Sequence, residues 1–430
     1  MNKKRIILVS VLFFLIASTG ILIGRWSIVG AEGEGYEDLK VFTETLTMVK
    51  KNYVEEVKTK DLVYGAIKGM LSSLDPHSSF LNPEAFKEMQ AETKGEFGGI
   101  GIQIGVKEGI LTVIAPIEDT PAYRAGLKAG DKIIKINNES ARDMSLHDAV
   151  TKMRGAPKTS VTITILREGW KETKDFTLIR EIIKIKSVKS KLLEDGIGYV
   201  KINQFQEQTA DDLSTALEKL KQEKMNSLIL DLRNNPGGLL NSAVSVTSQF
   251  LPTNKLVVYI KGKKGDRAEY NTTDERPSYD VPMIVLVNEG SASASEIVAG
   301  ALKDWNRAVI LGAKTFGKGS VQSVIPLSDG SGLRLTTAIY YTPKGTSIQA
   351  TGIVPDILVK LEPKEKGKEH PVIREKDLER HLENNEEKEE LKEPEEMAPI
   401  EVEEKDDTQL QRAMDLLKTW KVFEKIPKAS

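Results

Sequence analysis

Three serines on alternate positions, in the segment NEGSASASE at 288–296, could include a nucleophile. The segment follows an apolar run and precedes a helical pattern, so a serine there would lie near the positive end of a helix dipole, which favours a developing anion. If Ser293 attacks, the N–H of Ala294 can help to stabilise a tetrahedral oxyanion. Ser293 and Glu296 also have capping-box spacing, so the segment alone leaves a simple helix cap open.

A serine nucleophile needs a base, and the chain offers histidine or lysine. It contains no cysteine, which excludes thiol nucleophiles, disulfides and zinc–thiolate sites. His77, in LDPHSSF, would permit a Ser-His-Asp triad, although it can equally end a turn. Lys318 lies between two glycines in TFGKGSVQ, and burial could lower its pKa enough to make it a base. Gln322 could hold the amine in place; a loop lysine without a function is the alternative.

A third segment, DLRNNPGG at 231–238, supplies consecutive glycines at a loop-to-helix junction. Glycines let backbone N–H groups approach a substrate closely, so Gly237 or Gly238 could give a second oxyanion donor. The segment lacks the spacing and the lysine of a phosphate-binding loop.

The elements around these segments predict an α/β domain. From about Lys184, apolar strands alternate with helical patterns, which indicates a largely buried, mostly parallel sheet. Ligands of such sheets bind beyond the carboxyl ends of the strands, where the three segments would converge if their strands are neighbours. Residues 95–182 instead carry glycines and short strands and predict a small β-rich domain of roughly PDZ size.

The two ends of the chain differ in composition and periodicity from these two domains. The apolar run Ile6–Gly24 follows NKKR and predicts a membrane anchor or signal segment over 1–30, with the rest outside the cytoplasm. Residues 36–94 have helical periodicity, and Asn82 and Pro83 predict the start of a helix. Residues 363–406 read as a charged, solvated linker, and 407–430 as an amphipathic docking helix with Leu410, Met414, Leu417 and Trp420 on one face.

These motifs together resemble the carboxyl-terminal processing proteases, also called tail-specific proteases. The resemblance covers residues 36–360 and rests on GSASASEIVAGAL, TFGKGSVQ, DLRNNPGG and GIVPD in the family's order. It implies a Ser/Lys hydrolase with Ser293 as nucleophile, Lys318 as general base and Gln322 as the partner that orients the lysine. It also implies a catalytic α/β core at 183–362 of the crotonase/ClpP-like type, preceded by a PDZ domain, and no metal or organic cofactor.

The resemblance gives the small domain a function. PDZ domains add a peptide as an extra strand and hold its terminal carboxylate with backbone N–H groups. Ile100 and Gly101 are placed to offer those groups, while the apolar residues of the following helix (Leu146, Ala149, Val150 and Met153) could line a side-chain pocket or belong to the core. Arg154 could be a positioning contact or an ordinary surface arginine.

We therefore expect a membrane-anchored, extracytoplasmic serine endopeptidase that recognises unstructured or apolar protein C-termini and cleaves near them. Helices at both ends suggest a homodimer. The net charge of −2 gives no indication of a nucleic-acid partner. The alternatives are a non-catalytic, membrane-tethered PDZ adaptor and a crotonase-type acyl-transfer or hydratase enzyme, which would need a coenzyme A pocket.

Overall fold

The computed structural model describes residues 33–107, 109–142, 144–274, 278–360, 373–383 and 407–424. The membrane anchor or signal segment predicted over residues 1–30 lies outside these ranges. Within them, no helix combines the length and the apolar character needed to cross a bilayer.

Residues up to Leu71 form a unit of their own, and its described part, from residue 33, contains two helices. These are α2 (Gly33–Asn52) and α3 (Thr59–Ser72), as the helical periodicity of this region predicts. Helix α2 leaves large apolar side chains exposed to solvent, among them Leu39, Phe42 and Met48.

The second unit, from Ser72 onward, begins with a short strand and a helix, β1 (Ser79–Leu81) and α4 (Pro83–Lys94). The predicted start of α4 is confirmed, because the Asn82 side chain accepts a hydrogen bond from Ala85 N–H at 2.8 Å and Pro83 occupies the first turn. Strand β1 was not expected within a helical segment. Three residues are too few to show strand periodicity, and β1 forms by pairing with β18, more than 250 residues away in the chain.

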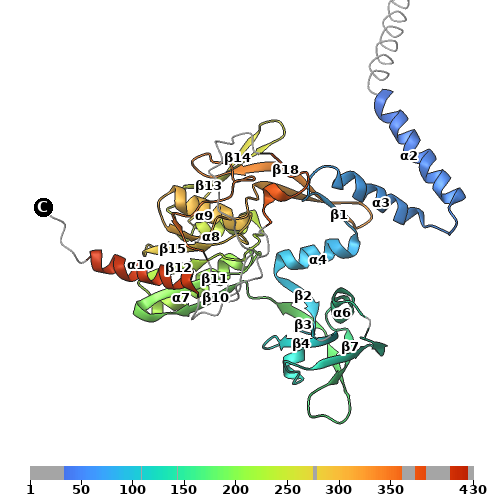
Figure 1. Ribbon diagram of the computed structural model, residues 1–430, viewed down its shortest axis with the longest axis horizontal. Helices are drawn as coiled ribbons and strands as arrows, with labels where there is room; N and C mark the ends of the chain where they lie inside the picture. Colours follow the sequence, from blue (N-terminus) through green and yellow to red (C-terminus); the bar gives the residue numbers. More distant parts are fainter. Residues whose placement is uncertain are drawn as a thin grey trace, which may run out of the picture. The chain divides into compact units, whose positions relative to one another are not determined.

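The β-rich region expected after residue 95 is present (Figure 1). Its sheet has the strand order β3-β4-β5-β7-β8, with β6 paired to β5, while β2 pairs with β9. Strand β3 is an edge strand, and α6 packs beside it. The bounds are β2 (Glu96–Gly99), β3 (Ile102–Lys107), β4 (Ile110–Pro116), α5 (Pro121–Arg124), β5 (Lys132–Ile136), β6 (Glu139–Ser140), α6 (Leu146–Met153), β7 (Ser160–Leu166), β8 (Lys174–Ile179) and β9 (Glu181–Lys184).

The catalytic candidates belong to a six-stranded sheet of order β10-β11-β12-β15-β16-β19. All pairings from β11 to β19 are parallel and only β10 is antiparallel, so the predicted mostly parallel α/β sheet is confirmed. The bounds are β10 (Val188–Leu192), η1 (Glu194–Gly196), β11 (Ile197–Ile202), α7 (Thr209–Gln222), β12 (Ser227–Asp231), α8 (Leu240–Thr247), β15 (Met283–Val287), α9 (Ala294–Asp304), β16 (Val309–Gly312) and β19 (Ile357–Leu358).

A second, antiparallel sheet contributes residues of β17 and β18 to the cavity described below. Its order is β1-β18-β13-β14, with β17 paired to β18. The bounds are β13 (Leu256–Gly262), β14 (Arg267–Asn271), β17 (Ser320–Pro326) and β18 (Gly332–Tyr341).

The parallel sheet is covered on both faces (Figure 1). Helices α7, α8 and α9 pack on one face, where Leu217, Val246 and Val298 belong to the main apolar core. Helix α10 (Thr408–Glu424) packs on the other face through Leu410 and Leu417. The C-terminal helix thus docks on the sheet of its own chain, while Trp420 is 53% exposed.

Residues 373–383 correct part of the predicted linker at 363–406. They contain the turn η2 (Glu375–Asp377), and both Arg374 and Glu375 are buried. The charge-rich composition suggested a solvated run, but these two charged side chains are buried against distant parts of the chain.

Candidate active site

The three candidate loops meet at the carboxyl edge of neighbouring parallel strands, as predicted. They follow β12, β15 and β16, which pair in that order. Hydrogen bonds join them directly: the side-chain Oγ of Ser291 donates to Leu232 O at 2.8 Å, and Phe316 N–H donates to Ser291 O at 3.1 Å.

The structure distinguishes the three serines. Ser291 and Ser295 are fully buried, and each hydroxyl donates to a backbone carbonyl, that of Leu232 and that of Asn235 respectively. Ser293 instead lines a cavity. Only Ser293 of the three is therefore placed to meet a substrate.

The backbone of Ser293 has an uncommon conformation. Its φ is 55° and its ψ is −112°, a left-handed value at a residue that carries a side chain. Such a conformation costs on the order of 1–3 kcal/mol and persists only where the surroundings impose it, often at functional sites. Ser293 is also the N-cap of α9, so its hydroxyl lies at the positive end of that helix.

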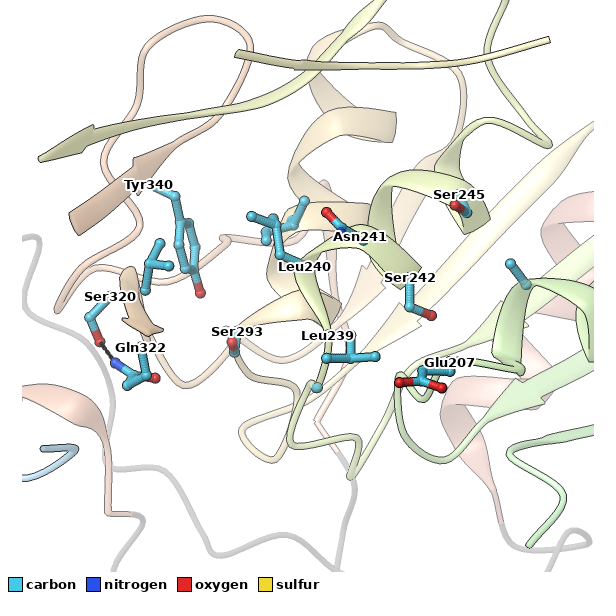
Figure 2. A pocket seen from close by; sticks show the side chains of 14 residues that line it. Glu207, Leu239, Leu240, Asn241, Ser242, Ser245, Ser293, Ser320, Gln322 and Tyr340 are labelled. Atoms are coloured by element: carbon cyan, nitrogen blue, oxygen red, sulfur yellow. Dashed lines mark hydrogen bonds between the residues drawn. The ribbon is translucent and has the colours of Figure 1, made fainter. Parts of the chain in front are cut away.

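The cavity beside Ser293 has a volume of about 640 Å³ and is partly apolar. In Figure 2, Ser320, Gln322 and Tyr340 lie on one side of Ser293, and Leu239 and Ser242 lie on the other. Its apolar lining comes from Ala210, Leu239, Leu240, Ile297 and Val321. The rest of the lining is polar and includes Glu207, Asn241 and Ser242, so the cavity can receive an apolar side chain only on its apolar part.

Tyr340 closes one wall of the cavity. Its hydroxyl donates to Lys318 O and is also within hydrogen-bonding reach of the Ser293 side chain. Burial raises the pKa of this phenol well above its usual value, so it stays a neutral donor.

The glycine pair lies against the candidate nucleophile. A Cβ on Gly237 would lie 2.7 Å from Ser293 Cβ and 2.9 Å from Ala294 N, and a Cβ on Gly238 would lie 2.1 Å from Phe205 O. With φ of 101° and 140°, both positions require glycine. The N–H of Gly237 donates to Asn235 Oδ1 at 2.9 Å. Within the described residues, the N–H groups of Gly238 and Ala294 meet no acceptor. Of the two glycines, Gly238 therefore has the available donor.

Lys318 lies in the loop between β16 and β17, and its side chain is largely enclosed. Burial lowers the pKa of its amine below the ordinary value, and the positive charge of Arg334 acts in the same direction. The negative charges of Glu375, Glu296 and Asp75 oppose this effect. In the part of the chain that the structure describes, its Nζ forms no ion pair and no hydrogen bond. These surroundings favour the neutral amine that a general base requires.

Gln322 lines the same cavity, but the structure does not place it on the lysine. Its Nε2 donates to Ser320 Oγ at 3.0 Å (Figure 2). It also donates to Thr336 Oγ1 at 3.3 Å. Because β17 and β18 hold both partners, Gln322 is anchored to the antiparallel sheet rather than to the amine of Lys318.

Glu296 is a residue whose wider role the sequence did not indicate. Its fully buried carboxylate accepts hydrogen bonds from Ser293 N–H at 2.8 Å, Thr315 Oγ1 at 2.5 Å, Gly317 N–H at 2.8 Å and Lys318 N–H at 2.9 Å. Burial raises the pKa of this carboxyl to about 7, although the four hydrogen bonds act to lower it. The capping-box spacing predicted only the first of these contacts.

His77, the alternative base, forms hydrogen bonds with residues other than Ser293. Its Nε2 lies 2.7 Å from Glu375 Oε2, and its carbonyl accepts a hydrogen bond from Arg334 Nε at 3.1 Å. Among the described residues neither His77 nor Lys318 forms a side-chain hydrogen bond to Ser293, and neither lines the cavity. Lys318 differs in that its backbone N–H shares the acceptor Glu296 Oε2 with the N–H of Ser293. The arrangement gives no support to a Ser-His-Asp triad.

The residues proposed for peptide binding line one groove of about 470 Å³ between β3 and α6. They include Ile100, Gly101, Leu146, Val150 and Arg154, together with Met153. Ala149 is fully buried in the core of this domain and does not line the groove. The Arg154 guanidinium stacks on Phe97, 4.6 Å from the ring centroid. The groove runs along an edge strand, which is the geometry that strand addition needs.

No group of three or more histidine, aspartate or glutamate side chains in the described ranges could hold a metal ion.

Three family models match the chain: peptidase family S41 over residues 196–359, the PDZ domain over 112–167 and the N-terminal domain of the activating protease CtpB over 28–85.

Several curated relatives match over most of their length. The carboxy-terminal-processing protease of Bartonella bacilliformis is 44% identical over 397 residues, which cover 90% of each chain. The carboxyl-terminal-processing protease of Synechocystis sp. is 36% identical over 79% of this chain and 80% of its own. CtpB of Bacillus subtilis is 36% identical over 77% of this chain and 69% of its own. Among solved structures, the photosystem II D1 C-terminal processing protease is 30% identical over 75% of this chain and 94% of its own, with a TM-score of 0.45.

Proposed function

Because the chain belongs to the carboxy-terminal-processing serine proteases of peptidase family S41, we propose that Ser293 and Lys318 are its nucleophile and general base. The observation that carries the proposal is the left-handed Ser293, which lines a partly apolar cavity together with Gly238. In the described structure the N–H groups of Gly238 and Ala294 have no acceptor. The enclosed Lys318, on the neighbouring loop, supplies the base.

The reaction follows from these positions. Neutral Lys318 removes the proton from Ser293 Oγ, which attacks the carbonyl carbon of the scissile peptide bond. The tetrahedral adduct collapses as Lys318 returns the proton to the leaving amine, and an acyl-enzyme remains. Lys318 then deprotonates a water molecule, which attacks the ester carbon. When the second adduct collapses, Lys318 returns this proton to Ser293 Oγ, and the new C-terminal carboxyl group leaves.

The N–H groups of Gly238 and Ala294 are the proposed oxyanion donors. Gly238 lines the cavity together with Ser293, Ala294 directly follows Ser293 in the chain, and neither N–H is engaged elsewhere in the described structure. Preorganised donors of this kind stabilise the charge that develops on the carbonyl oxygen. Gln322 lines the cavity and holds Thr336, so we propose a supporting role for it at this site rather than direct orientation of the amine.

The substrates of a protease with a PDZ domain are proteins recognised by their C-termini. We propose that the groove between β3 and α6 binds the terminal residues, with the N–H groups of Ile100 and Gly101 on the carboxylate and Leu146 and Val150 against the last side chain. The apolar lining of the catalytic cavity supports cleavage after an apolar residue.

The remaining features of this proposal come from the sequence. The apolar run Ile6–Gly24 supports a single-pass anchor with an extracytoplasmic catalytic part. We retain the division into segments 36–94, 95–182, 183–362, 363–406 and 407–430, with the packed residues 373–383 as an exception within the linker. The crotonase/ClpP-like character of the core and a homodimer also remain predictions.

The experiment that tests substrate choice uses an unstructured protein ending in apolar residues. The wild-type enzyme should shorten it, and amidation of its C-terminus or replacement of its last residues by aspartate should raise KM because the PDZ groove no longer holds it. Equal processing of all three substrates would contradict C-terminal recognition.

Two rival functions make different predictions. A non-catalytic PDZ adaptor would bind the same substrate without turnover. A crotonase-type enzyme would bind coenzyme A, and the absence of coenzyme A binding in a protein that cleaves the substrate would exclude it. The enclosed Lys318 beside a strained serine favours the protease over both.

A further inference from the structure

Residues 373–383, which we call the strap, pack onto the loop that carries Lys318. Glu375 N–H donates to Phe316 O at 3.3 Å, and Arg374 Nη1 donates to Thr315 O at the same distance. The strap thus holds the start of the segment 315–319, which we call the lysine loop and which Glu296 also contacts.

A third contact reaches the lysine loop through Gln349. Its Oε1 accepts a hydrogen bond from Gly319 N–H at 2.9 Å, and its Nε2 donates to Glu375 Oε1 at 2.9 Å and to Leu382 O at 3.1 Å. The buried amide therefore joins both ends of the strap to the residue that follows Lys318.

Glu375 is the chemically unusual member of the strap. Its side chain has no exposed surface, and its carboxylate accepts hydrogen bonds from His77 Nε2, at 2.7 Å to Oε2, and from Gln349. Burying a carboxylate is costly, and a buried ion pair is seldom more stabilising than an apolar replacement. Stability alone therefore gives little reason for a carboxylate at this position.

The charged groups around Lys318 come from four elements. Arg334 on β18 carries positive charge, whereas Glu296 on α9, Glu375 in the strap and Asp75 before β1 carry negative charge. His77 contacts two of these groups: its ring Nε2 bonds to Glu375, and its backbone carbonyl accepts a hydrogen bond from Arg334. Asp75 accepts hydrogen bonds from Ser78 and Thr336, so its charge is held in place.

We propose that Glu375 is a positioning residue of the catalytic site, which holds the lysine loop and places a buried negative charge beside the amine of Lys318. The proposal rests on the Ser/Lys mechanism proposed above. Burial and Arg334 both disfavour the protonated amine, and a base that is too weak accepts the serine proton poorly. A fixed anion balances these effects and keeps Lys318 basic enough to act. The strap thereby brings a C-terminal part of the chain into the catalytic machinery.

The test is the variant Glu375→Gln in the full-length protein, which keeps the size of the side chain and removes its charge. We expect the Lys318 amine to titrate at lower pH than in the wild type. NMR of ¹³C-lysine-labelled protein monitors this titration, and the signal missing from Lys318→Arg assigns the Lys318 resonance. The rising limb of kcat/KM, where Lys318 loses its proton, should move to lower pH in parallel, and the plateau above it should fall by about threefold to tenfold because the weaker base is less effective.

Two matched variants separate charge from packing. Glu379→Gln removes an exposed carboxylate from the same strap and should change neither titration nor activity. Gln349→Met weakens the anchorage of the strap but keeps the charge of Glu375, so it should lower activity without moving the Lys318 titration to lower pH.

The proposal is overturned if folded Glu375→Gln protein, with a near-native melting temperature, shows the wild-type Lys318 titration. It is also overturned if Gln349→Met reproduces the full effect of Glu375→Gln, since packing alone would then explain it. Failure of the Ser/Lys mechanism is distinguishable, because it would appear as proteolysis that survives in Lys318→Ala, whereas the NMR titration requires no turnover.

Discussion

Glu296 Oε2 accepts a hydrogen bond from the backbone N–H of Lys318 at 2.9 Å, although the two residues are 22 positions apart. The same oxygen accepts the N–H of Ser293 at 2.8 Å. One buried carboxylate oxygen therefore fixes the backbones of the proposed nucleophile and of the proposed base relative to each other. The second oxygen, through Thr315 and Gly317, holds the start of the lysine loop.

The variant Glu296→Gln should lose most of the activity. A glutamine side chain offers a single acceptor oxygen, so two of the four donors would remain without a partner at a cost of about 1–3 kcal/mol each. We expect kcat to fall by roughly 10²-fold, since small displacements of reacting groups are costly, and the melting temperature to fall as well. Steady-state kinetics and thermal unfolding measure the two effects. Wild-type kcat in this variant would show that the carboxylate does not position the site.

Activity should rise as pH increases through neutrality. Glu296 must be ionised to accept its four hydrogen bonds, and burial places its pKa at about 7. Lys318 must be neutral to act as a base, and burial lowers its pKa below the ordinary value. Both groups reach the active state by losing a proton, so their effects have the same sign. A profile of kcat against pH with its maximum on the acid side of pH 7 would contradict this assignment.

Gly238→Ala should abolish turnover by displacing an oxyanion donor. The new Cβ would lie 2.1 Å from Phe205 O at a φ of 140°, so the backbone must move. Loss of one such donor typically costs about 10²- to 10³-fold in kcat. Gly262→Ala is the control, because its Cβ would meet only Thr337 O at 3.8 Å. Comparable kinetics in the two variants would argue against Gly238 as a donor.

Asp407→Ala should destabilise the catalytic domain. Arg233 lies between Asp231 and Asp407, with Nη2–Oδ2 distances of 2.7 and 2.8 Å, and Asp407 also caps α10 through Leu410 N–H. Removing one partner of a buried ion pair costs several kcal/mol, and we expect about 3 kcal/mol here because Asp231 remains. Asp415→Ala, on the exposed face of the same helix, is the matched control. Equal free energies of unfolding in the two variants would contradict a structural role for the pair.

The same network predicts an acid limit to stability. Burial alone would raise the pKa of Asp231, but hydrogen bonds and charge from Arg233 hold it below its usual value. A carboxyl group with a lowered native pKa contributes stability above its unfolded pKa, near 4, and loses that contribution below it. The free energy of unfolding, measured as a function of pH, should therefore show this loss of stability only below about pH 4.

Local patterns in the sequence predicted the elements that position the site. Strand–helix alternation predicted the parallel sheet and the convergence of its loops, and Asn82 with Pro83 predicted the start of α4. The choice of Ser293 among three serines came from the resemblance to a family, because the residues alone left a helix cap open. The structure separates the three by burial and by the backbone angles of Ser293.

Contacts between distant segments could not be predicted in this way. Nothing in the spacing of Glu296 indicates its bonds to Thr315, Gly317 and Lys318, which depend on two loops meeting in space. Glu375 lies in a charge-rich run, where composition indicates solvent exposure, yet its partner His77 is 298 positions away. Gln322 was expected to contact Lys318, and the pairing of β17 with β18 directs it to Thr336 instead.

The most direct test of the account is cleavage of an unstructured protein with an apolar C-terminus by Ser293→Ala, alongside Ser291→Ala. We predict that Ser293→Ala lowers turnover by at least about 10⁴-fold, while its affinity for the C-terminal peptide stays at the wild-type value. Ser291→Ala should retain turnover if it folds, because that hydroxyl bonds only within the loop framework. Turnover that persists in Ser293→Ala would contradict the assignment of the nucleophile and the mechanism built on it.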